Sequence, residues 1–172
     1  MPRGLDGATP PLRYAWPSAR GHRTAIDGET MPDAAHGDAS TMEAHHDAVL
    51  SFDEGIPGFR ESRRFRLTQP HAESAFQVLE SLDEDGVALL VTEPWLFFPD
   101  YTFDLPEGDR EALALERPED AIVVCAITVD GTARTAWANL RAPFVLNAQS
   151  LRGRQVVLDD EQPLRATLPI EW

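Results

Sequence analysis

Hydrophobic and polar positions form short runs separated by turn residues in the larger, C-terminal part of this chain. The longest apolar run, Ala121 to Val129, is rich in Ile and Val. A run this short, made of β-branched residues, favours a strand buried on both faces over a helix. We therefore expect this strand to be the element around which the rest of the chain is organised.

The residues after this run predict a hairpin and an elbow. Asp130-Gly131 is a pair that tolerates the positive φ angles of a tight primed turn, so a return strand is expected over residues 133–139. Pro143 has no N–H to donate to a ladder, so the next strand, Phe144 to Asn147, has to begin afresh. Between the two strands, residues 139–143 (NLRAP) predict a polar elbow at which a rigid sheet can present a recognition surface.

Further short strands are predicted on both sides of the hairpin, at residues 48–52, 64–67, 75–82, 87–92, 156–158 and 164–168. The only helix predicted is Glu107 to Glu116, which has acids in its first turn and Pro118 beyond its end. About eight or nine strands at roughly ten-residue spacing are typical of an antiparallel barrel or sandwich. The predicted fold is therefore mainly β, a small antiparallel β-barrel-like domain with one short helix.

Two corners interrupt the strands. Residues 55–59 (GIPGF) predict a tight corner, because the glycines supply unusual φ angles and the proline fixes its own. Residues 94–101 (PWLFFPDY) form the densest aromatic patch, and the flanking prolines exclude a long central strand or a helix. Phe97 and Phe103 are expected in the core, whereas partial exposure is expected for the other aromatic residues, Trp95, Phe98 and Tyr101.

Residues 1–41 are predicted to be a disordered tail, and residues 42–172 the folded domain. The tail holds five Pro and five Gly, few aliphatic residues and no hydrophobic period. Met31 and Met42 leave open a translation start later than Met1. Deleting such a tail is expected to leave the fold and partner binding nearly unchanged.

Charge and composition narrow the classes of function. The chain carries 15 cations, all Arg, against 29 acids, and residues 42–172 hold 11 of the cations and 24 of the acids. This charge disfavours direct binding of DNA or RNA and favours a basic partner, although acidity can also serve solubility alone. The single Cys125 is expected to be a buried hydrophobe. No run is long enough to cross a bilayer, and no secretion signal is recognised, so a cytoplasmic protein is expected.

No set of residues predicts catalysis, a cofactor or a metal. Nucleotide-binding glycine motifs, a phosphate loop and a serine elbow are all missing from the sequence. His45-His46 lacks further ligands, and the acidic turn at residues 83–86 has its glycine at the wrong place for an EF-hand calcium loop. No set of residues therefore supports an enzymatic function, although a cleft with convergent titratable groups in the structure would make an enzyme possible again.

Four motifs occur together in a familiar order: residues 52–59 (FDEGIPGF), 97–101 (FFPDY), 139–147 (NLRAPFVLN) and 153–158 (GRQVVL). Over residues 46–168 the chain resembles the bacterial flagellar assembly factor family FliW. The resemblance implies a β-barrel-like cytoplasmic protein without enzymatic activity. Its two competing partners would be flagellin, held before export, and the RNA-binding translational repressor CsrA, which the free protein would inactivate.

The resemblance and the two stiffened segments together identify candidate partner contacts. These are expected to be Phe98, Asp100, Tyr101, Leu140, Arg141 and Asn147. Asn147 is equally consistent with closing a turn through backbone hydrogen bonds, and Asn139 is assigned to the scaffold. A ligand-binding barrel with an unfilled interior and an acidic adaptor protein remain alternative functions.

Overall fold

The computed structural model describes residues 12–14, 48–71, 73–158 and 161–170. The rest of the predicted tail, the alternative starts Met31 and Met42, and His45-His46 lie outside these ranges. The strands are β1 (Leu12–Tyr14), β2 (Val49–Ser51), β3 (Arg64–Thr68), β4 (Gln77–Ser81), β5 (Ala88–Thr92), β6 (Phe103–Leu105), β7 (Ala121–Asp130), β8 (Thr135–Ala138), β9 (Phe144–Asn147), β10 (Gly153–Gln155) and β11 (Ala166–Thr167). The helices are the 3-10 turns η1 (Pro94–Leu96) and η2 (Pro118–Asp120) and the α-helix α2 (Glu107–Ala112).

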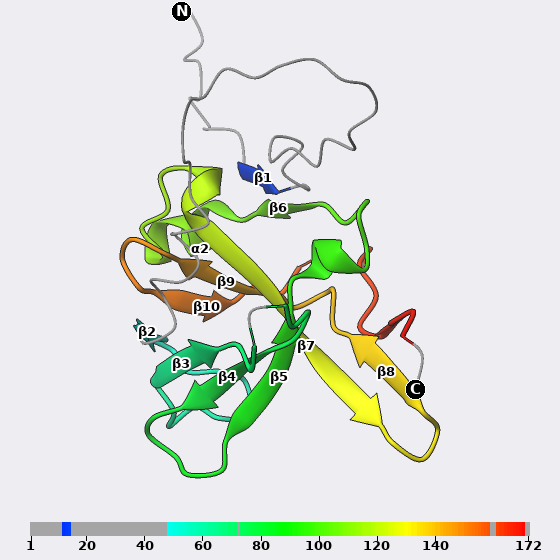
Figure 1. Cartoon of the computed structure of the whole chain (residues 1–172). Coiled ribbons are helices and arrows are strands. Elements are labelled where there is room, and N and C mark those ends of the chain that lie inside the picture. Colours follow the sequence, from blue (N-terminus) through cyan, green and yellow to red (C-terminus); the bar gives the residue numbers. More distant parts are fainter. Residues whose placement is uncertain (1–11, 15–47, 72, 159–160, 171–172) are drawn as a thin grey trace, which may run out of the picture.

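The strands form a mainly antiparallel sheet in the order β10-β9-β7-β5-β4-β3-β2, with β8 and β11 continuing from β7 (Figure 1). A separate pair joins β1 to β6, with Leu12 opposite Leu105. Among the described residues, the two ends of the main sheet meet through a single bridge, between Ser51 and Arg152, so this sheet does not close into a full barrel. The predicted mainly β fold with a short helix is confirmed.

Strand β7 is the centre of this arrangement. Its first half pairs with β9, its middle with β5 and its second half with β8. Successive side chains of a strand point to opposite faces, and here Val123 and Cys125 enter one core cluster while Val124 enters another. The prediction of a strand buried on both faces is confirmed at these three residues. Burial also raises the pKa of the Cys125 thiol to about 12, as expected for a thiol with a packing role.

The turn after β7 differs from the prediction. Asp130 pairs with Thr135, so four residues separate the strands instead of two. The Asp130 carboxylate accepts the backbone N–H groups of Thr132 and Ala133, at 3.0 and 2.9 Å. The positive φ occurs at Arg134 (52°) and not at Gly131. The prediction of a primed two-residue turn was wrong because the aspartate side chain stabilises a longer loop.

Three element boundaries also differ from the prediction. Helix α2 ends at Ala112, and the positive φ of Ala114 (53°) stops the helix before Pro118. Strand β10 covers Gly153–Gln155, whereas the sequence placed the strand on the apolar run at residues 156–158. The last strand, β11, is only two residues long. For the two strands, the ladder partners, and not the local apolar run, determine where each strand begins and ends.

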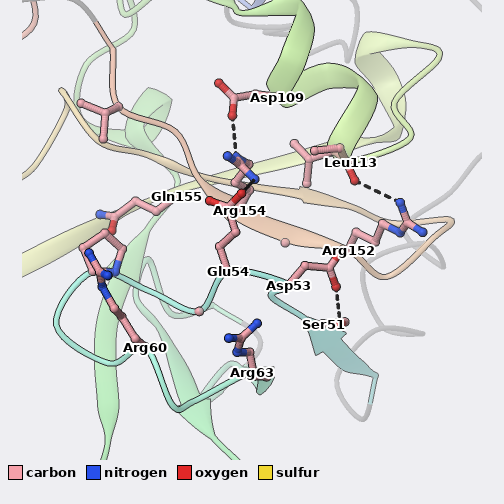
Figure 2. A pocket seen from close by; sticks show the side chains of 15 residues that line it. Ser51, Asp53, Glu54, Arg60, Arg63, Asp109, Leu113, Arg152, Arg154 and Gln155 are labelled. Atoms are coloured by element: carbon pink, nitrogen blue, oxygen red, sulfur yellow. Dashed lines mark hydrogen bonds and ion pairs between the residues drawn. The ribbon is translucent and has the colours of Figure 1, made fainter.

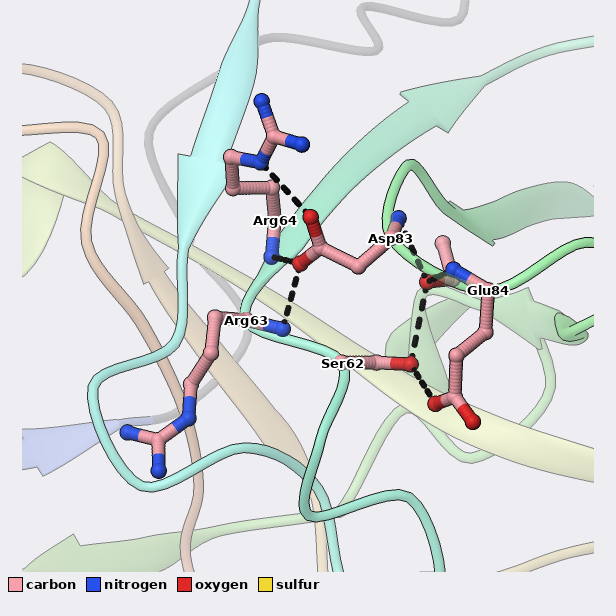
Figure 3. A network of polar contacts seen from close by, with 6 residues as sticks. Ser62, Arg63, Arg64, Asp83 and Glu84 are labelled. Atoms are coloured by element: carbon pink, nitrogen blue, oxygen red, sulfur yellow. Dashed lines mark hydrogen bonds and ion pairs between the residues drawn. The ribbon is translucent and has the colours of Figure 1, made fainter.

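The acidic turn between β4 and β5 is joined by hydrogen bonds to the chain at the start of β3 (Figure 3). One oxygen of Asp83 accepts the backbone N–H groups of Arg63 and Arg64 at 2.8 and 2.7 Å. The other accepts Nε of Arg64 at 2.7 Å. Next to it, the buried Ser62 hydroxyl donates to the carboxylate of Glu84 and accepts from the hydroxyl of Ser81. This turn is therefore an anchor for the start of β3.

We predict that the stability gained from Asp83 depends on pH. Hydrogen bonds from the backbone of Arg63 and Arg64, and then from the Arg64 side chain, lower the pKa of this carboxyl. A group whose folded pKa is lowered stabilises the fold above its unfolded pKa, about 3.9 for aspartate, and loses this effect as pH falls through the folded value. Asp83→Asn should therefore lower the denaturant midpoint at pH 7, and the difference from wild type should shrink in acid below that range.

Asp85→Asn is the matched control, because Asp85 is exposed in the same turn. Its difference from wild type should be small at neutral pH. Equal effects of the two substitutions at pH 7 would contradict an anchoring role for Asp83.

Candidate functional site

The elbow at residues 139–143 is held on all sides by hydrogen bonds. The Asn139 side-chain oxygen accepts the N–H of Ala142 at 3.1 Å, which closes the turn. The Leu140 N–H donates to the carbonyl of Pro163 at 3.1 Å, and the backbone carbonyl of Arg141 accepts the N–H of Leu158 at 2.8 Å. The elbow is therefore a fixed loop, and its turn depends on the asparagine that the sequence assigned to the scaffold.

The aromatic corner at residues 94–101 has a similar rigidity. Pro94 begins the 3-10 turn η1, and its carbonyl accepts the N–H groups of Phe97 and Phe98 at 3.1 and 2.8 Å. The Trp95 indole N–H donates to the carbonyl of Tyr101 at 2.8 Å, which ties the start of the corner to its end. The ring of Phe97 stacks on that of Phe76, with centroids 5.8 Å apart.

Corner and elbow form one surface because two contacts join them. The Tyr101 hydroxyl donates to the carbonyl of Leu140 at 2.8 Å. Burial raises the pKa of this phenol, so the hydroxyl keeps the proton that it donates. Gln162 adds a second bridge: its carbonyl accepts Nε of Arg141 at 2.8 Å, and its amide donates to the carbonyl of Thr102 at 2.9 Å. We call residues 94–101 and 139–143 together the corner–elbow surface.

The candidate contact residues differ in exposure within this surface. Asp100 is exposed, and Phe98 and Arg141 are half-buried, as is Trp95. Tyr101 and Leu140 are buried, with exposed fractions of 5 % and 4 %. The expected partial exposure is thus confirmed for Trp95 and Phe98, and it is wrong for Tyr101, whose hydroxyl finds its partner inside the protein. Asp100, Phe98 and Arg141 have side chains that another protein can reach.

Asn147 lies apart from the corner–elbow surface, at the other end of β9. Its side-chain amide donates to the carbonyls of Leu113 and Ala114, both at 2.9 Å. Its side-chain oxygen accepts the N–H groups of Gln149 and Ser150, at 2.8 and 3.2 Å. With 2 % of its surface exposed, this side chain joins the end of α2 to the turn that leads to β10.

Two features of the structure have no signal in the sequence. Gln162 lies in a segment without a motif, so its bridging role depends entirely on the tertiary arrangement. A cleft lined by arginines lies between the chain after β2 and strand β10. Among the described residues there is no group of His, Cys, Asp or Glu that could hold a metal ion. No described helix is long and apolar enough to span a membrane.

Comparison with known proteins places these features in a family context. A sequence profile of the family "FliW protein" matches residues 35–168. The "Flagellar assembly factor FliW" of Clostridium beijerinckii is 35 % identical over 127 residues, which are 74 % of this chain and 88 % of that protein. The protein of the same name from Bacillus subtilis strain 168 is 33 % identical over 119 residues, 69 % of this chain and 83 % of that protein.

A solved structure agrees with these sequence matches. It is described as "Crystal structure of the flagellar assembly factor FliW" and aligns with a TM-score of 0.67 at 31 % identity. The alignment covers 74 % of this chain and 89 % of the solved chain. The similarity thus extends over nearly the whole of each relative and, in this chain, over the sheet that carries the corner–elbow surface.

Proposed function

This chain belongs to the FliW family of flagellar assembly factors, and we propose that it binds two protein partners in the cytoplasm. One is flagellin, which it holds before export. The other is the translational repressor CsrA, which the free protein binds and antagonises, so that repression of flagellin translation is relieved. The observation that carries this proposal is the family match over residues 35–168, which includes both halves of the corner–elbow surface.

The charge of the chain supports a basic second partner. Residues 42–172 hold 11 Arg and 24 acids. A repressor that binds RNA has to present basic surface, because phosphates dominate RNA affinity. An acidic protein would be steered toward such a surface, with faster association at low salt than at high salt.

The corner–elbow surface supports protein binding by its stiffness. Pro94 begins the corner, Pro99 lies near its end, and Pro143 ends the elbow. Because backbone hydrogen bonds already fix these segments, little ordering entropy is lost when a partner binds. Phe98 offers an apolar anchor at this surface, and Asp100 offers a carboxylate that can accept hydrogen bonds from an arginine or a backbone amide.

The test is a binding experiment with purified flagellin and purified CsrA, singly and in competition. Each partner should form a complex with the full chain, and flagellin should displace CsrA as its concentration rises. A chain that binds neither partner, or that binds both in one ternary complex, would contradict the proposal.

We predict that Asp100→Ala and Phe98→Ala weaken binding of at least one partner by about 1–2 kcal/mol each, as expected for interface anchors. Arg141→Ala should also weaken binding, but part of its effect should come from the fold, because Nε of Arg141 donates a hydrogen bond to the carbonyl of Gln162. Binding is measured by titration calorimetry, and unfolding is measured on the same samples. Asp85→Ala is the control: it removes the same charge from an exposed site at the other end of β5. If Asp100→Ala binds as tightly as this control, the partners bind elsewhere.

A further inference from the structure

An arginine-lined cleft lies on a protein that is otherwise strongly acidic. It has a volume of about 680 Å³ and lies where the chain after β2, strand β10 and helix α2 meet. Four of its lining residues are arginines: Arg60, Arg63, Arg152 and Arg154. Figure 2 shows them on different sides of one hollow, two from the segment between β2 and β3 and two from β10 and the residue before it. A cleft of this size lies in the range of clefts that bind drug-sized ligands.

One of the four arginines is neutralised within the protein. Arg154 contacts the carboxylate of Glu54 at 3.0 Å and that of Asp109 at 2.5 Å. These two ion pairs join the corner after β2 to helix α2 across β10. They use two of the three acids in the lining, and the third, Asp53, accepts a hydrogen bond from the Ser51 hydroxyl at 3.4 Å.

The positive charge that remains comes mainly from Arg60 and Arg63. Both side chains are exposed, and within the described part of the chain neither forms an ion pair or a side-chain hydrogen bond. Arg152 also lies in the lining, and among the described residues its guanidinium donates to the carbonyl of Ala112, at 3.1 Å. Three arginines therefore face the cleft without a carboxylate partner among the described residues, and the lining as a whole holds four arginines against three acids, Asp53, Glu54 and Asp109.

Arg60 and Arg63 are attached to fixed backbone. Gly55 (φ 68°) packs against the backbone of Arg60, where an added Cβ would lie 2.8 Å from the Arg60 carbonyl oxygen. The backbone carbonyl of Arg63 accepts the N–H of Phe52 at 2.7 Å, and the backbone N–H of Arg63 donates to the carboxylate of Asp83. The bases of the two side chains are thus held in place before any ligand arrives, which lowers the entropic cost of binding.

The cleft also borders the free end of the sheet. Strand β10 is the last strand of the order, and in the part of the chain that the structure describes a single bridge, between Ser51 and Arg152 just before β10, links this end of the sheet to β2. An edge strand offers backbone N–H and C=O groups to an extended chain that pairs with it. Every second side chain of the added chain then points to the same face of the sheet. Guanidinium groups beside such an edge match carboxylates on the added chain, because they bind carboxylates through paired hydrogen bonds.

We propose that this cleft binds a short extended segment of a partner protein that carries carboxylate side chains, with Arg60 and Arg63 as the cations that receive them. The site is separate from the corner–elbow surface and does not depend on the identity of the partners proposed above. It gives an acidic protein one place at which an acidic segment is attracted instead of repelled.

The test uses the full chain and a fluorescein-labelled peptide in which Glu and Val alternate, with a matched peptide in which Gln replaces Glu. The Glu peptide should bind saturably and more weakly at high salt, and the Gln peptide should bind far less. Arg60→Gln and Arg63→Gln should each raise the Kd of the Glu peptide about tenfold or more. Arg165→Gln, which removes an exposed arginine next to β11, should leave the Kd of the Glu peptide within about twofold of the wild-type value.

Three results would overturn the proposal. The first is equal affinity for the Glu and Gln peptides, which needs no variant to fold. The second is an equal change in the Kd of the Glu peptide for the Arg63→Gln and Arg165→Gln proteins, when both variants keep the denaturant midpoint of the wild type. The third is displacement of the bound peptide by inorganic phosphate at an equal concentration, which would assign the arginines to a site for small anions.

Discussion

Replacing Asn147 by alanine is expected to lower the free energy of unfolding by about 3 kcal/mol, because buried polar groups would lose their hydrogen-bond partners. The carbonyls of Leu113 and Ala114 would lose the amide that donates to both, and the N–H groups of Gln149 and Ser150 would lose their acceptor. Urea unfolding followed by tryptophan fluorescence measures the change.

Asn139→Ala is the matched control for this prediction. Asn139 is the same residue type, but it is half-buried and its side-chain oxygen accepts one hydrogen bond, from Ala142. Its loss should cost about 1 kcal/mol. If Asn147→Ala instead unfolds at the wild-type midpoint and loses affinity for flagellin or CsrA, Asn147 contacts the partner and is not mainly part of the scaffold.

Elements whose stability depends on local pattern could be predicted from the sequence. The apolar residues of β7 indicate a central strand, because burial on both faces requires apolar residues at successive positions. Pro143 separates β8 from β9 as predicted, because a proline cannot donate to the ladder. Strands β2 to β5 lie within two residues of their predicted positions, whereas β10, where the pairing departs from the apolar run, could not be placed. Val157 belongs to an apolar run but is 69 % exposed, because the pairing with β9 uses residues 153–155.

The candidate site shows the same division. The stiffness of the corner and the elbow follows from their prolines, so both segments could be found in the sequence. The burial of Tyr101 could not be predicted, because it depends on a hydrogen bond to Leu140, far away in the chain. The cleft depends on two pairs of arginines that only the meeting of β2 and β10 brings together. In the sequence they are separate surface arginines.

Gly153→Ala is the second substitution with a large expected effect, a loss of about 2–3 kcal/mol of unfolding free energy from overpacking. A Cβ at this position would lie 2.5 Å from the ring of Phe52. That ring is fully buried, edge-on to Phe65 at 5.0 Å and to Phe144 at 6.3 Å, so it has no space into which to move. Gly131→Ala is the control, because a Cβ there meets no atom within 4 Å.

A double-mutant cycle with Phe52→Leu identifies the cause of this loss. A smaller side chain at position 52 should make room for the new Cβ, so the double variant should be more stable than the sum of the two single effects predicts, by about 1 kcal/mol or more. Simple additivity would show that the clash with Phe52 is not what destabilises the alanine variant. Because Gly153 begins β10, the same cycle also tests whether contact with Phe52 fixes the strand that borders the arginine cleft.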